Sequence, residues 1–243
     1  MNKKQRISSL VLNAVIIAAV IVSASLSFVL ESVEDGIKPN WTTILYFTVL
    51  SNIVLAVASI ATIVDIAKSW KQDKFTLNKH IFIFKYIATT GTTLTFLVVL
   101  LILLPGVSTM EKYKNIHLYR NEQAMLHLVI PLIGLFTFIF TEYSTTPAKW
   151  TFALSFTEGL VYLILILPFI LTDTYLKNSP RKEEAPYPFL YFNTNPWWES
   201  MLWCLGLTAL FIGIGAGVYF SNWAAFNKMY PKYWKKNYNQ NKK

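Results

Sequence analysis

Residues 7–30 read ISSLVLNAVIIAAVIVSASLSFVL, and none of these side chains carries a charge. A run of about 20 apolar residues is long enough to cross the hydrocarbon core of a bilayer as a helix. This run is too long for the core of a signal peptide and has no obvious small-residue cleavage site, so we expect it to be retained. The opening stretch therefore predicts a membrane-spanning helix.

Further apolar runs of similar length follow along the chain. We place the spans at about 7–30, 41–66, 81–104, 123–141, 151–172 and 198–221. Helix is the expected state for each of them, because open strands cannot satisfy their backbone hydrogen bonds in lipid. The sequence therefore predicts an all-α fold, in which residues 1–243 form a single integral membrane bundle of six transmembrane helices.

The composition excludes several classes of protein. Hydrophobic residues make up 54% of the chain and charged residues 14%, whereas soluble domains carry about 45–50% and about 25%. A soluble enzyme, a nucleic-acid-binding protein and a secreted disulfide scaffold are therefore excluded. The single cysteine, Cys204, rules out an intrachain disulfide and a thiolate-rich metal site. We expect a multi-pass protein of the cell membrane with neither a metal nor a cofactor.

Basic residues fall unequally on the two sides of this predicted bundle. With the N-terminus inside, fourteen lie on the inner side: Lys3, Lys4, Arg6, Lys68, Lys71, Lys74, Lys79, Lys149, Lys228, Lys232, Lys235, Lys236, Lys242 and Lys243. Seven lie on the outer side: Lys38, Lys112, Lys114, Arg120, Lys177, Arg181 and Lys182. Because Lys and Arg collect in cytoplasmic loops, the bias predicts that both termini are cytoplasmic. The net charge of +9 then reflects topology.

Polar side chains in the second and fourth spans occupy a similar depth. At 1.5 Å per residue, Thr48 lies roughly 10 Å below the start of its span and His127 roughly 6 Å below the start of its own. Ser51 and Asn52 share a helical face with Thr48. Pro131 follows His127 by four residues, so the His127 carbonyl loses its usual helical partner and the helix is expected to bend or open there.

A hydroxyl beside an imidazole is the minimal constellation for covalent acyl transfer. The histidine removes the hydroxyl proton as the oxygen attacks a carbonyl carbon, and Ser51 or Asn52 could support the site or donate to the oxyanion. The plainer alternatives remain open at this point. Hydroxyl and amide side chains in membranes often hydrogen-bond neighbouring helices, and His127 could be a satisfied core histidine.

Two further ionisable residues lie at membrane depth. Lys85 stands at the inner start of the third span, and Glu158 lies seven residues into the fifth span from the same side. Ionisable residues inside a membrane are functional candidates, because placing them there costs free energy. Their similar depths favour a structural ion pair between Lys85 and Glu158, with a proton-relay or transport role for Glu158 as the alternative.

The motifs resemble those of the androgen-induced protein family. Tyr46-Phe47-Thr48-Val49-Leu50-Ser51-Asn52 looks like its threonine motif, His127 with Pro131 looks like its histidine motif, and Tyr187-Pro188-Phe189-Leu190 resembles a third stretch between the last two helices. The chain also resembles the related bacterial six-helix branch. The resemblance implies an intramembrane threonine hydrolase that cleaves fatty acid esters of hydroxy fatty acids, with Thr48 as nucleophile and His127 as base.

The hydrolase interpretation implies a membrane lipid or fatty acyl ester that arrives from the bilayer, and no nucleic-acid partner. We expect the aromatic, proline-rich segment within Asp173 to Glu199 to lie at the outer interface as a cap over the site. The alternative function is a small-molecule membrane carrier or binding subunit without catalysis. Against it, no paired broken helices and no repeat between the halves mark a transport site.

Overall fold

The computed structural model describes residues 1–34, 41–72, 75–103, 121–144, 149–179 and 184–231. Every regular element within these ranges is helical. The elements are α1 (Lys3–Glu34), η1 (Trp41–Leu45), α2 (Phe47–Lys68), α3 (Lys79–Val98), η2 (Val99–Leu103), α5 (Asn121–Ala124), η4 (Met125–Val129), α6 (Ile130–Thr141), η5 (Lys149–Phe156), α7 (Thr157–Leu171), α8 (Thr174–Asn178), η6 (Pro188–Leu190) and α9 (Trp197–Met229). The predicted all-α fold is confirmed for the described residues.

Within the part of the chain that the structure describes, five helical segments are long and apolar enough to cross a membrane. They are Lys3–Val29, Phe47–Lys68, Lys79–Leu101, Trp150–Leu171 and Trp197–Met229. The fourth predicted span corresponds to a shorter apolar helix, Met125–Thr141. The second span begins later than expected, because the chain makes a separate 3-10 turn at η1 before α2 starts at Phe47.

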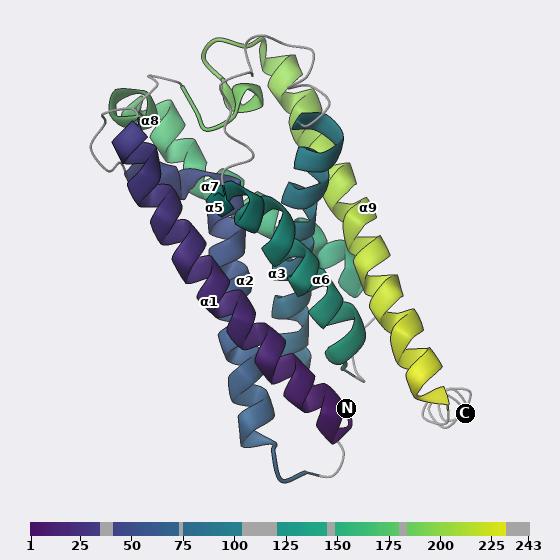
Figure 1. Cartoon of the computed structure of the whole chain (residues 1–243). Coiled ribbons are helices and arrows are strands. Elements are labelled where there is room, and N and C mark those ends of the chain that lie inside the picture. The colour runs from purple at the N-terminus through teal and green to yellow at the C-terminus, as the bar shows by residue number, and fades with distance from the viewer. Residues whose placement is uncertain (35–40, 73–74, 104–120, 145–148, 180–183, 232–243) are drawn as a thin grey trace.

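The long helices run up and down beside one another, with α3 in the middle (Figure 1). α3 packs against α2, α6, α7 and α9, whereas α1 covers α2 and α6 from the side. The outward faces carry exposed aliphatic side chains, including Val11 and Val15 on α1 and Ile164 on α7. Large exposed apolar surfaces mark contact with a membrane or a partner. This arrangement fits a bundle whose outside faces lipid.

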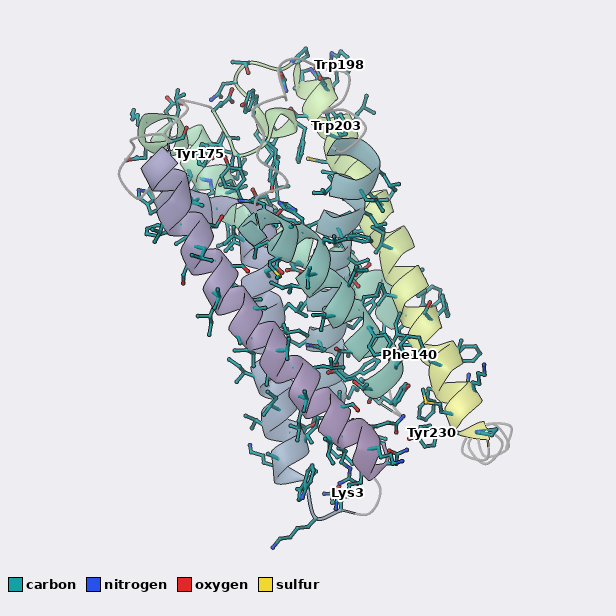
Figure 2. All side chains as sticks on the ribbon, viewed as in Figure 1. Lys3, Phe140, Tyr175, Trp198, Trp203 and Tyr230 are labelled. Carbon is teal, nitrogen blue, oxygen red and sulfur yellow. The ribbon has the colours of Figure 1, made fainter. Side chains whose placement is uncertain are left out.

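Hydrogen bonds tie the start of α1 to the end of α9. Gln5 donates its side-chain amide to the sulfur of Met229 at 3.3 Å and accepts a hydrogen bond from the Tyr230 hydroxyl. Lys3 and Tyr230 accordingly lie at one end of the bundle, and Trp198 lies at the other (Figure 2). The start of α1 and the end of α9 are thus on the same side, as the predicted topology requires. Many of the basic residues counted for orientation lie outside the described residues.

The aromatic segment at the opposite end packs onto the helices. Leu190 and Ala185 are buried in one cluster with Phe47 of α2, Leu94 of α3 and Phe211 of α9. Glu184 accepts hydrogen bonds from the Asn193 backbone N–H at 2.6 Å and the Thr194 hydroxyl at 2.9 Å, which closes the segment into a compact loop. The described residues of this segment therefore pack over the start of α2, and their position at the outer interface stays a prediction.

Candidate active site at the start of α2

The first two turns of α2 hold the predicted threonine site. Tyr46 precedes the helix in an extended conformation and provides no side-chain cap. Thr48, Ser51 and Asn52 are all buried, as their shared helical face predicts. The Ser51 hydroxyl donates to the Thr48 carbonyl at 3.1 Å, and the Asn52 amide donates to the same carbonyl at 2.7 Å.

Asn52 also joins α2 to the segment that carries His127. Its amide nitrogen donates to the Leu126 carbonyl at 3.1 Å, in addition to the Thr48 carbonyl. The Asn52 oxygen is buried and has no hydrogen-bond partner. Thr48 and His127 are therefore held in neighbouring turns of two packed helices. The second predicted span and the turn that carries His127 are thus neighbours in the structure.

His127 lies in a π-helical turn, η4. The backbone N–H of Ile130 donates to the Met125 carbonyl, five residues earlier, and Pro131 follows in the first turn of α6. The opened helix expected from Pro131 is thus present. Single π-turns occur often at functional sites because they widen the helix and re-aim a side chain. Nδ1 of His127 is buried and has no hydrogen-bond partner.

Thr48 and His127 are not hydrogen-bonded to each other in the structure. The side chain of Thr48 instead meets the hydroxyl of Tyr187, which also interacts with the backbone of Phe47 and Thr48. The N–H groups of these two residues open α2 and have no acceptor within the helix. Burial raises the pKa of Tyr187 to about 12, against the opposing effect of the Thr48 side chain. The phenol is therefore neutral at ordinary pH.

Other aromatic rings hold Tyr187 in place. Its ring stacks on Phe189 at a centroid distance of 5.3 Å and lies edge-on to Tyr46 at 6.0 Å. It also lies 6.5 Å from the ring of Tyr162, whose hydroxyl donates to the Leu45 carbonyl at 3.0 Å. Sequence reasoning identified this segment as a cap but missed Tyr187 as a site residue. The signal was present in the Tyr187-Pro188-Phe189-Leu190 motif, but the path of a loop cannot be read from spacing.

The predicted ion pair between Lys85 and Glu158 does not form. Lys85 is fully buried and donates to Asn13 Oδ1 at 2.7 Å and to Ser59 Oγ at 2.6 Å. The same Asn13 donates through Nδ2 to Glu142 Oε1 at 2.6 Å. The anionic partner of Lys85 is therefore Glu142, reached through Asn13. Glu142 falls just outside the predicted fourth span, 123–141, and it lies fully buried just after α6.

The helical wheel of α3 explains why Lys85 and Glu158 stay apart. Lys85 turns toward α1 and α2, whereas the Glu158 carboxylate packs against Gly91 of α3 from the side of α7. Six residues separate positions 85 and 91, which at 3.6 residues per turn puts them on different faces. Gly91 also lies about 9 Å further along α3 than Lys85, so Lys85 and Glu158 differ in depth as well as in the face that they meet.

Family models, curated proteins and solved structures show no match to this chain. Among the described residues, no three His, Cys, Asp or Glu side chains lie close enough together to hold a metal ion. The chemistry that the site supports is therefore inferred from its own geometry.

Proposed function

We propose that this chain is a multi-pass protein of the cell membrane that cleaves lipid esters, with Thr48 as nucleophile and His127 as general base. One observation carries the proposal: the Asn52 amide bridges the carbonyls of Thr48 and Leu126, and so holds the hydroxyl and the imidazole in adjacent turns. The buried and unpartnered Nδ1 of His127 supports it, because a base must keep a free lone pair.

The reaction proceeds in two steps. His127 accepts the Thr48 proton as the oxygen attacks the ester carbonyl, and the protonated imidazole then gives that proton to the departing alcohol. A water molecule, activated in turn by His127, cleaves the acyl-threonine and releases the fatty acid. Ser51 and Asn52 already donate their hydrogens to backbone carbonyls, so their role is support.

Tyr187 is the better oxyanion donor. Its hydroxyl lies beside Thr48 at the start of α2, where the negative charge of the tetrahedral intermediate develops, and its pKa of about 12 keeps the hydrogen in place. A positioned, neutral donor of this kind stabilises the transition state more than the ground state. The phenol therefore hydrogen-bonds to Thr48 at rest and to the oxyanion during reaction.

The substrate class is a long-chain ester of the type in which a fatty acid esterifies a hydroxy fatty acid. An apolar groove between α1 and α6 runs along the residues that follow the His127 turn, and its lining includes Leu12, Leu132, Phe136 and Phe140. A fatty acyl chain suits such a groove, because burial of apolar carbon drives its binding. The ester would then approach laterally from the bilayer.

A phosphonate probe of the serine-hydrolase type tests the nucleophile directly. Purified protein should be labelled on Thr48, as located by mass spectrometry of the peptide. Thr62→Ala is the matched control, because Thr62 is a buried threonine on the same helix that only donates to the Ala58 carbonyl. Labelling on another residue, or none at all, contradicts the proposal.

Tyr187→Phe should slow ester hydrolysis by ~10²–10³-fold in kcat, the usual effect of losing one oxyanion donor. The ring remains, so its stacking on Phe189 and the fold should be kept. The measurement is steady-state hydrolysis of a fatty acyl ester in lipid nanodiscs. Tyr191→Phe, in the same segment, should retain the wild-type rate, and equal rates for both variants would remove Tyr187 from the mechanism.

The proposed orientation has six spans and both termini in the cytoplasm. Its spans are the five long helices together with the shorter helix Met125–Thr141, which is fourth along the chain. In a Cys204→Ser background, a cysteine replacing the exposed Asn178 should react with a membrane-impermeant thiol reagent in intact cells. A cysteine replacing the exposed Lys71, three residues after the end of α2, should react only after lysis, because α2 ends at the opposite end of the bundle from α8 (Figure 1). The reverse pattern would invert the topology.

A further inference from the structure

Glu158 is buried near the middle of the bundle. It lies in the first turn of α7, and Gly91, which it contacts, lies near the centre of the span Lys79–Leu101. The contact is close, since a Cβ placed on Gly91 would lie 2.5 Å from the carboxyl carbon of Glu158. The carboxyl group is thus pressed against the backbone of α3 at the level of the bilayer core.

Neither carboxyl oxygen of Glu158 has a hydrogen-bond partner in the structure. The titratable groups placed nearby among the described residues are tyrosines. Tyr162 lies one turn later on α7, the Tyr86 hydroxyl of α3 lies beside Ser155, and Tyr219 of α9 packs on Tyr86 with ring centroids 6.0 Å apart. Lys85 points away toward Asn13 and Ser59. No described cation or N–H donor therefore offsets a negative charge at Glu158.

An ionised carboxylate in these surroundings would be very costly. Moving an isolated charge into an apolar medium costs so much free energy that the group usually neutralises instead. Two ligands can neutralise it, a proton or a metal cation. A hard cation needs a shell of several oxygen atoms, whereas the Glu158 oxygens face the carbon surface of Gly91. This geometry favours the proton.

Two hydroxyl groups lie between Glu158 and the start of η5. Ser155 lies one turn before Glu158, in η5. Its hydroxyl is buried and makes no hydrogen bond to Glu158, and the Tyr86 hydroxyl lies close to it. A Cβ placed on Gly215 of α9 would be 2.5 Å from both Ser155 Oγ and the Tyr86 oxygen. Tyr86 in turn donates to the Phe152 carbonyl at 3.0 Å, nearer the start of η5.

We propose that Glu158 is a proton-binding site: a carboxylic acid held neutral at the centre of the membrane, which exchanges its proton with the inner side along Ser155 and Tyr86. The site is independent of the Thr48 chemistry, which lies on α2. Its ligand is the proton itself. Loss of that proton would place a negative charge directly against Gly91 and loosen the contact between α3 and α7.

Infrared spectroscopy of the protein in nanodiscs tests this site at neutral pH. The carbonyl stretch of a protonated carboxylic acid should be present in the wild type and reduced in Glu158→Gln, whose amide has the shape of the neutral acid. Glu184→Gln is the matched control. Its side-chain oxygens already accept two hydrogen bonds, from the Asn193 N–H and the Thr194 hydroxyl, so this variant should keep the protonated-acid band of the wild type.

Two results would overturn the proposal. If Glu158→Gln leaves the protonated-acid band unchanged, Glu158 is ionised. If the band appears in the wild type only when Na⁺ and K⁺ are replaced by choline, the site binds a metal cation.

Thermal melting gives a second and independent readout. The wild type and Glu158→Gln should have the same Tm at neutral pH. As the pH rises, the Tm of the wild type should fall below that of Glu158→Gln, because only the wild type has a proton to lose at this position. Parallel melting curves across the alkaline range would also contradict the proposal.

Discussion

Thr48→Ala should abolish both the hydrolysis of fatty acyl esters and covalent labelling by a phosphonate probe. The variant has no oxygen to carry the acyl group, so both activities depend on the same missing atom. Thr48→Ser should keep part of the activity, since the oxygen survives and only a methyl group is lost. The measurement is ester turnover in nanodiscs, with folding checked by thermal melting.

His127→Ala should slow hydrolysis by ~10²–10⁴-fold, the usual worth of a positioned general base. The wild-type rate should also fall at acidic pH, because an imidazolium cannot accept the Thr48 proton. His80→Ala is the matched control: His80 is exposed at the start of α3, and its loss should leave the rate unchanged. Wild-type turnover by Thr48→Ala would end the hydrolase proposal and favour the membrane carrier.

Lys85→Met should destabilise the fold by about 3–5 kcal/mol, the usual cost of leaving a buried charge without compensation; here the compensation reaches Glu142 through Asn13. The substitution leaves Glu142 buried without its cation and leaves Asn13 Oδ1 and Ser59 Oγ without the Nζ donor that they share. The measurement is the free energy of unfolding in mixed micelles.

The double variant Lys85→Met with Glu142→Leu should be more stable than Lys85→Met alone, because no uncompensated charge remains inside the bundle. Lys79→Met, at the exposed start of the same helix, should have little effect on the free energy of unfolding. Equal losses for the single and the double variant would show that Lys85 and Glu142 do not interact.

Much of the fold and part of the site were predictable from the chain itself. Uncharged runs of spanning length must be helices in lipid, because only an internal hydrogen-bond ladder satisfies the backbone there. Depth within a span follows from the helical rise, so Thr48 and His127 could be assigned a common level. Pro131 predicted an open turn at His127, because proline has no N–H to donate.

The tertiary structure decided which residues at one depth meet. Lys85 and Glu158 were predicted to share a level, but α3 turns Lys85 to Asn13 and Ser59 and brings Gly91, six residues further along the helix, against Glu158. Tyr187 reaches Thr48 because the segment between α8 and α9 folds back over α2. Residue spacing determines height along a helix and relative angle around it, but it does not determine which neighbour each face meets. That choice is made only when the helices and loops pack together.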